Sequence, residues 1–161
     1  MKSGPEVVLI LDNIRSVHNV GPIFRTADAF GVSKIYCLGV TPTPLDRFGR
    51  ARKDLTKVSL GAEKSVSWKK EGKGVGLIEE LKSKGFFILA LEQGEGALSC
   101  NEISPKEKIA LIVGSETDGV SNELRITSGA LLEIPMRGEK ESLNVAVAAG
   151  IALAFIVGVN R

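Results

Sequence analysis

Three segments of the sequence combine glycines with side chains that can do chemistry, and the first of them is residues 19–26. It holds Asn19 and Arg25, which lie six positions apart. On a helix, this spacing puts the amide and the guanidinium on neighbouring faces, so that both can address one phosphate or hydroxyl group. The alternative is structural, with Asn19 capping the helix and Arg25 solvated.

The second segment, residues 112–119, begins in an apolar run and places Glu116 between Gly114 and Gly119. A glycine at the end of a buried strand lets the backbone approach a ligand closely. A carboxylate beside it would then face that ligand. The alternative is an ordinary turn that carries a solvated acid.

The third segment, residues 134–145, is a polar loop that ends with Ser142 and Asn144 just before a long apolar stretch. Either side chain can serve as a helix cap, which is the structural alternative. Open α/β sheets bind ligands where their strands end. If all three segments follow strands of one sheet, we expect them to form one site.

The small number of histidines and cysteines argues against zinc sites and hydrolase triads. The chain has one histidine, His18, and two cysteines, Cys37 and Cys100, which form no CxxC pair. These residues cannot complete a zinc site, and no Gly-x-Ser-x-Gly elbow is present for a hydrolase triad. We expect two reduced, buried thiols and a histidine near the start of a helix. The glycines of residues 72–76 lack Rossmann and Walker spacing, so we expect a surface turn there.

The elements that must hold these segments alternate between strands and helices. Apolar runs predict strands at residues 7–11, 35–38, 86–91, 109–113 and 131–134. Helical spacing predicts helices at residues 19–30, 77–84, 122–126 and 143–159. This order predicts an α/β domain with a mostly parallel sheet and helices on both faces. The 161 residues are enough for one such domain.

Residues 39–63 show no clear periodicity and are expected to form a loop. They also hold the densest positive charge in a chain whose formal net charge is only +2. Only Asp46 and Asp54 lie near the basic residues. These are Arg47, Arg50, Arg52, Lys53 and Lys57. The concentration of charge favours a polyanionic partner, and the alternative is a solvated loop.

The last expected helix, residues 143–159, is apolar on nearly every side and must therefore be covered. Its 17 residues reach only the lower limit of the roughly 17 to 25 that a membrane span needs. We expect no membrane span, and either a central core helix or a helix shared with a homodimer interface. The start of the chain lacks the apolar run of a signal peptide, which favours a reducing cytoplasmic location.

Taken together and in order, the three segments resemble the motifs of the SpoU/TrmH branch of the SPOUT methyltransferases. The similarity runs from about residue 13 to residue 155. The matching residues are Asn19, Gly21, Arg25, Thr26 and Ala27, then Gly114, Glu116 and Gly119, then Ile134, Pro135, Met136, Ser142, Leu143, Asn144 and Val145. The resemblance implies an α/β domain with a deep C-terminal trefoil knot that binds S-adenosylmethionine. It also implies methyl transfer to a ribose 2′-hydroxyl of tRNA or rRNA, without a metal, by a homodimer that packs through the last helix.

The resemblance assigns roles to individual positions. The catalytic positions are Asn19, Arg25, Glu116, Ser142 and Asn144. The methyl donor is expected against Leu91, Gly114, Ile134, Met136 and Leu143. The RNA-facing residues follow from the local charge rather than from the resemblance, and they are expected to be Arg47, Arg50, Arg52, Lys53 and Lys57. Because a guanidinium stays protonated, we expect Arg25 to orient a phosphate and stabilise charge rather than act as a base.

The sequence departs from the family pattern in two ways. Ala146 stands where many relatives carry a serine, which is a small change. We also expect residues 1–161 to form a single methyltransferase domain without an accessory RNA-binding domain, so that substrate choice comes from the domain itself or a partner.

Two other functions compete with RNA methylation. One is another transferase or an oxidoreductase that uses a nucleotide cofactor, which the missing glycine fingerprint disfavours. The other is an inactive RNA-binding module, which the five intact catalytic positions disfavour.

Overall fold

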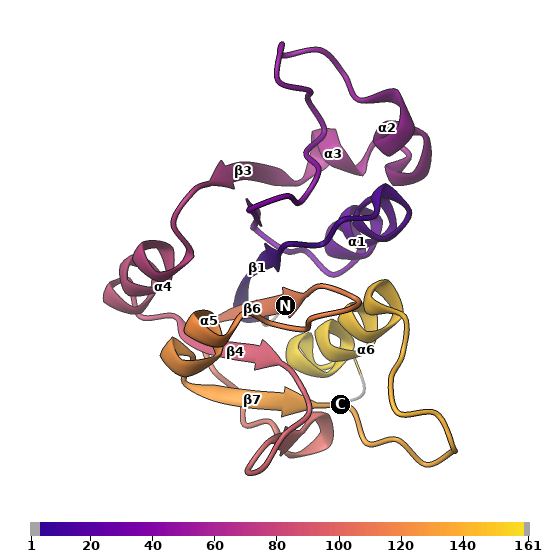
Figure 1. Cartoon of the computed structure of the whole chain (residues 1–161). Coiled ribbons are helices and arrows are strands. Elements are labelled where there is room, and N and C mark those ends of the chain that lie inside the picture. The colour runs from indigo at the N-terminus through magenta and orange to yellow at the C-terminus, as the bar shows by residue number, and fades with distance from the viewer. Residues whose placement is uncertain (1–3, 160–161) are drawn as a thin grey trace.

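A parallel sheet of seven strands forms the centre of the described part of the chain (Figure 1). The computed structural model describes residues 4–159. Residues 1–3 and residues 160 and 161 lie outside the described part. The prediction about a signal peptide concerns the start of the chain and so falls partly on residues 1–3. The strands are Glu6–Asp12 (β1), Lys34–Leu38 (β2), Ser67–Glu71 (β3), Phe87–Leu91 (β4), Leu98–Ser99 (β5), Lys108–Gly114 (β6) and Ala130–Glu133 (β7). They lie in the order β3-β2-β1-β6-β4-β7-β5.

Helices cover both faces of the sheet, which confirms the predicted α/β class. They are Val17–Ala29 (α1), Lys53–Ser59 (α2), Ala62–Ser65 (α3), Gly74–Ser83 (α4), Asn122–Thr127 (α5) and Val145–Val157 (α6), with a 3-10 turn at Cys100–Glu102. Side chains of β1 alternate between the two faces, as a strand requires. Leu9 packs in one cluster with residues of α1 and α6, and Ile10 packs in another with residues of α4 and α5. Figure 1 shows the two pairs of helices on opposite sides of the sheet.

The order of the strands places the winding change beside β6, one of the strands whose ends border a cavity. From β1 the chain proceeds to β2 and β3 at one edge, and β6, β4, β7 and β5 fill the other half of the sheet. The direction of winding therefore changes between β1 and β6, where Asp12 pairs with Gly114 at the carboxyl ends of the two strands. In open parallel sheets this is the position at which ligands bind.

Four short elements were not predicted, and residues 39–63 are not wholly a loop. That segment contains α2 and α3, while β3 and β5 are additional strands. Helix α2 has little apolar sequence and is stabilised by packing on α1, where Val58 lies so close to Gly21 that a Cβ there would be 2.1 Å from the valine Cγ2. Strand β3 is a polar edge strand, which has no alternating apolar pattern to detect.

Helices α4 and α6 are among the elements whose boundaries differ from the predicted ones. Helix α4 begins at Gly74, so the turn predicted at residues 72–76 is partly the first turn of a helix. Helix α6 is two residues shorter at each end than predicted, because Asn144 caps it and Gly158 ends it with a φ of 81°. Within residues 4–159, no helix is both long enough and apolar enough to cross a membrane.

Candidate active site

A cavity of about 590 Å³ opens where β4, β6 and β7 end. Its walls are the strand ends, the turn at residues 115–119 and the loop that leads into α6. All the residues predicted to hold the methyl donor line it: Leu91, Gly114, Ile134, Met136 and Leu143. Three of the predicted catalytic residues, Glu116, Ser142 and Asn144, line it as well.

A chain of hydrogen bonds joins the three sequence segments at the rim of this cavity. The Asn144 side chain donates from Nδ2 to Oδ1 of Asn19 at 3.0 Å. Asn19 in turn donates from its own Nδ2 to Oε1 of Glu116 at 2.5 Å. These residues lie 125 and 97 positions apart in the sequence. The structure thus brings Asn19, Glu116 and Asn144 together.

The local structure explains how each of these side chains is held. Ser16, not Asn19, caps α1, because its hydroxyl accepts the N–H of His18 at 3.2 Å. Asn19 therefore points from within the first turn of the helix, and its structural alternative is wrong. Asn144 does cap α6, since its Oδ1 accepts the N–H groups of Ala146 and Val147 at 2.9 and 3.2 Å. Its Nδ2 still reaches Asn19, so the cap and the network coexist.

Glu116 is carried by a tight turn, and its exposed side chain has a defined partner in Asn19. Ser115 and Gly119 pair across the turn, and the Ser115 hydroxyl accepts the N–H of Asp118 at 3.0 Å. Gly119 has a φ of 69°, a conformation that favours glycine. The turn therefore holds the exposed Glu116 carboxylate against the Asn19 amide.

At Gly114 the sequence suggested close approach of a ligand, whereas the structure shows close approach of another part of the backbone. A Cβ on Gly114 would lie 2.1 Å from the carbonyl carbon of Gly119 and 2.2 Å from the nitrogen of Val120. The close approach at this glycine is thus made by the chain's own backbone. Gly114 lines the cavity, but a side chain there would first displace the turn that carries Glu116.

Arg25 lies apart from the other predicted catalytic residues. Its side chain is exposed on α1, and the described residues that line the cavity do not include it. Asn19 is not in the wall either, but its hydrogen bonds connect it to two residues that are. Any action of Arg25 is therefore on a substrate that extends beyond the cavity.

Two carboxylates that sequence reasoning missed hold the turn in place. The buried Asp12, which is 3% exposed at the end of β1, accepts the N–H of Ser121 at 2.7 Å. Glu92, which follows β4 and lines the cavity, accepts the N–H of Val120 at 2.8 Å. Both residues directly follow predicted strands. Because open α/β sheets bind ligands where their strands end, the sequence could have indicated these two carboxylates as well.

Gln93, beside Glu92, ties two walls of the cavity together. Its Nε2 donates to the carbonyl oxygen of Glu141 at 2.7 Å and so links the segment after β4 to the loop before α6. That loop holds Met136 and Ser142, so the hydrogen bond helps position two predicted site residues. Nothing in the local sequence around Gln93 indicates this contact.

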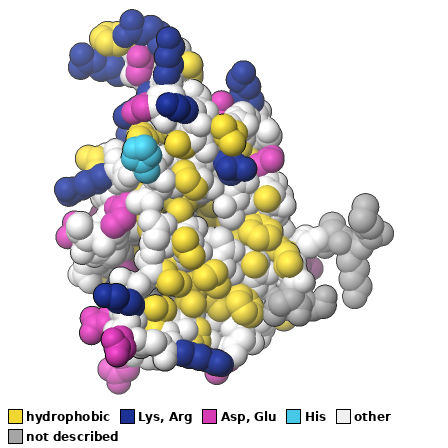
Figure 2. Space-filling view, turned by 90° about the vertical axis from the view of Figure 1, so that its right-hand side faces the viewer, with side chains coloured by type: hydrophobic (Ala, Val, Ile, Leu, Met, Phe, Trp, Pro, Cys, Tyr) yellow, Lys and Arg dark blue, Asp and Glu magenta, His cyan; other side chains and the backbone are white. Residues whose placement is uncertain are grey.

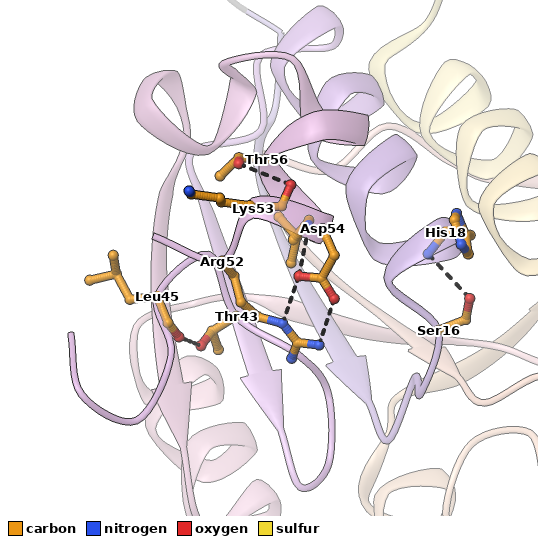
Figure 3. A network of polar contacts seen from close by, with 9 residues as sticks. Ser16, His18, Thr43, Leu45, Arg52, Lys53, Asp54 and Thr56 are labelled. Carbon is orange, nitrogen blue, oxygen red and sulfur yellow. Dashed lines mark hydrogen bonds and ion pairs between the residues drawn. The ribbon is translucent and has the colours of Figure 1, made fainter. Parts of the chain in front are cut away.

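The five basic residues predicted to contact RNA lie in helix α2 and in the segment just before it. Two of them are paired, since Arg50 contacts Asp46 at 3.2 Å and Arg52 contacts Asp54 at 3.0 Å. Figure 3 shows the Arg52 guanidinium folded against the Asp54 carboxylate, and this hydrogen bond lowers the pKa of Asp54. In residues 4–159 no salt bridge involves the other three, which are Arg47, Lys53 and Lys57.

The remaining candidate nucleophiles are inert. Cys37 and Cys100 are free and buried, as predicted, and burial raises their pKa values to about 12 and about 11. Both thiols are therefore neutral near pH 7. His18 lies in the first turn of α1, as expected. Across residues 4–159, no group of three His, Cys, Asp or Glu side chains is arranged to hold a metal ion.

Known proteins share both the sequence and the fold. The profile of the SpoU rRNA Methylase family matches residues 6–154. The 23S rRNA (guanosine-2'-O-)-methyltransferase RlmB of Neisseria meningitidis serogroup B is 34% identical over 94% of this chain and 58% of the relative. The tRNA (guanosine(18)-2'-O)-methyltransferase of Aquifex aeolicus is 32% identical over 94% of this chain and 69% of the relative.

A solved structure agrees with these relatives. The AdoMet-bound rRNA methyltransferase of Sinorhizobium meliloti superposes with a TM-score of 0.84 at 28% identity, over 95% of this chain and 56% of that one. The chain thus spans little more than half of the two rRNA methyltransferases. Because the profile covers nearly all of its length, and the segments that the profile spans form one site, the chain belongs to the SpoU rRNA Methylase family.

Proposed function

We propose that this chain is an S-adenosylmethionine-dependent methyltransferase that acts on a ribose 2′-hydroxyl of tRNA or rRNA. The observation that carries the proposal is the hydrogen-bonded series Asn144, Asn19 and Glu116 at the rim of a ligand-sized cavity. The names of the Neisseria and Aquifex relatives give the reaction, and they support both classes of RNA. The Sinorhizobium enzyme binds AdoMet, which supports the cofactor.

The cavity suits this cofactor. Its volume of about 590 Å³ lies within the roughly 300 to 1,000 Å³ of small-molecule sites. Apolar residues such as Leu91 and Leu143 offer a surface for an adenine ring. The carboxylates of Glu92, Glu116 and Glu133 offer negative charge to a ligand that carries a sulfonium and an ammonium group.

The contribution of the chain to the reaction is mainly positioning. When bound, the cofactor would supply a methyl group that is open to in-line attack by the ribose oxygen, with the methyl–sulfur bond breaking as the methyl–oxygen bond forms and the hydroxyl proton released to solvent. Asn19 and Asn144 fix the carboxylate of Glu116, and this rigid edge orients the ribose. Arg25, which can only donate, binds a neighbouring phosphate and stabilises negative charge near the attacking oxygen.

We also propose the RNA surface, the dimer and the knot. Arg47, Arg50, Arg52, Lys53 and Lys57 form the RNA-facing surface. The homodimer packs through α6, where Val147 is 51% exposed and other apolar residues are only half-buried. Figure 2 shows hydrophobic side chains gathered on the α1 and α6 side of the molecule, which supports that interface. Family membership supports the deep C-terminal trefoil knot.

Two further expectations stay predictions. One is that residues 1–161 act as a single methyltransferase domain. The other is a cytoplasmic location, which agrees with two free, buried cysteines.

The proposed function is tested by incubating the protein with labelled S-adenosylmethionine and total bacterial RNA, followed by nucleoside mass spectrometry. We expect a 2′-O-methylated nucleoside, and its identity names the target. Label on a base instead of a ribose would contradict the reaction. Cofactor binding with no transfer to any RNA would favour an inactive RNA-binding module.

A further inference from the structure

Residues 44–52 form a closed hairpin turn at one end of the molecule. Leu45 and Ala51 pair in an antiparallel bridge, and the N–H of Arg52 donates to the carbonyl of Pro44 at 2.8 Å. Within the turn, Gly49 has a φ of 77°, which favours glycine. No residue of this turn is among the described residues that line the cavity. The turn therefore has a defined conformation, and it lies outside the proposed catalytic centre.

The carboxylate of Asp46 holds the tip of this turn. It accepts the N–H of Phe48 at 2.8 Å, the N–H of Arg50 at 3.0 Å, and Nε of Arg50 at 3.2 Å. The backbone hydrogen bond from Arg50, with that from Phe48, lowers the pKa of Asp46. Asp46 thus stays charged near pH 7 and fixes the positions of the residues at the tip.

The turn presents an aromatic ring that lies close to two guanidinium groups. Phe48 is 66% exposed and belongs to neither hydrophobic core cluster of the described residues. The guanidinium carbons of Arg47 and Arg50 lie 4.8 and 5.0 Å from the centre of its ring. Figure 2 shows basic side chains around a hydrophobic patch at this end of the molecule. One exposed ring needs no explanation, but a ring held by a fixed turn and flanked by cations has the chemistry of a base-stacking site.

We infer that Phe48 is a platform on which an unpaired RNA base stacks, while Arg47, which forms no salt bridge within residues 4–159, contacts a phosphate beside that base. The inference rests on the proposed function, because it takes RNA as the partner. Every base has a π face, so the platform tolerates any sequence. In a duplex the bases already stack on one another, so the platform selects single-stranded regions such as loops. The substrate class is thus RNA with an unpaired nucleotide that reaches the hairpin when the target ribose is in the catalytic site.

The test compares Phe48 variants on a single-stranded RNA of about twelve nucleotides that contains 2-aminopurine, and on the same strand in a duplex. We expect the parent to prefer the single strand and to change the 2-aminopurine fluorescence. Phe48→Ala should weaken binding of the single strand roughly 5- to 150-fold, whereas Phe48→Trp should keep it. Phe48→Leu is the matched control, because it keeps an apolar side chain without a π face and should behave like Phe48→Ala.

Salt dependence separates stacking from charge. Phe48→Ala should leave the slope of log affinity against log salt unchanged, while Arg47→Ala should make it shallower by roughly 0.7 to 0.9. A parent that does not bind the single strand, or a Phe48→Ala variant that binds with parental affinity, overturns the platform. So does a Phe48→Ala variant that changes only self-association or binding to lipid vesicles. Methyl transfer by the parent to total RNA, measured in parallel, tests the proposed function separately, because transfer can persist when the platform fails.

Discussion

The carboxamide of Asn144 serves both the fold and the site. Its oxygen caps α6, and its nitrogen holds Asn19, which holds Glu116. A side chain that can cap α6 but cannot donate to Asn19 would distinguish the role in stability from the role in the site. Serine caps helices well, but its side chain is too short to replace the amide that reaches Asn19.

Asn144→Ala should therefore lower the free energy of unfolding by about 1 kcal/mol, whereas Asn144→Ser should change it by only a few tenths. Both variants should lower methylation, by roughly 100-fold, because the Glu116 edge loses its support. Chemical denaturation and single-turnover transfer measure the two effects. Full activity in Asn144→Ser would show that the hydrogen-bond series is not needed for transfer.

Arg25 is the predicted catalytic residue whose position is least like the others, because it is exposed outside the cavity wall. Arg25→Ala should leave the Kd for S-adenosylmethionine unchanged and lower methylation roughly 100- to 1,000-fold. Arg25→Lys should not restore it, because an ammonium lacks the planar fork. Arg125→Ala is a matched control, since Arg125 is exposed on α5 at the opposite face of the sheet. Normal turnover in Arg25→Ala would make Arg25 an ordinary surface residue.

Among the elements, β6 and the turn after it depend most on one small residue. Gly114→Ala should destabilise the protein by roughly 1 to 3 kcal/mol, because its Cβ meets the Gly119–Val120 backbone. Calorimetry should show loss of cofactor binding in the same variant, and Gly114→Val should be worse. Gly138→Ala is the control, because a Cβ there meets no atom within 4 Å. If Gly114→Ala unfolded like the parent and still failed to bind cofactor, contact with the ligand would be the reason for this glycine.

The basic hairpin and α2 form the second element with a testable role. Replacing Arg47, Arg50 and Arg52 by alanine should weaken RNA binding and make its salt slope shallower by roughly 0.7 to 0.9 for each residue that contacts a phosphate. Most of the change in the salt slope should come from Arg47, since Arg50 and Arg52 have carboxylate partners. Lys82→Ala, on α4 at the other face, should bind like the parent. An unchanged affinity and slope in the triple variant would place the RNA surface elsewhere.

For the whole molecule, the exposed part of α6 predicts a homodimer. Val147 is 51% exposed on a helix whose other side is in the core, and an apolar surface of this kind favours association. Sedimentation at micromolar concentration should show a dimer for the parent and a monomer for Val147→Glu. Ile126→Glu is the control, because Ile126 is 72% exposed on α5. A monomeric parent with full activity would contradict the dimer.

The sequence alone determined the centres of the main elements and most of the site. Strands β1, β2, β4, β6 and β7 were predictable because each contains a local, continuous apolar run. The glycines and polar residues after β6 and β7 were recognisable because strand ends in an α/β sheet are where ligands bind. The resemblance to a known family then connected these segments to one chemistry.

Only the tertiary structure decided which of these residues meet. Asn19 reaches Glu116 across 97 positions, and Asp12 reaches Ser121 across 109, and no local pattern contains such contacts. Elements α2 and β3 exist because α1 and β2 offer them a surface, so their own sequences carry little signal. The same holds for Gly114, which is glycine because the backbone of Gly119 and Val120 passes within the space of a methyl group.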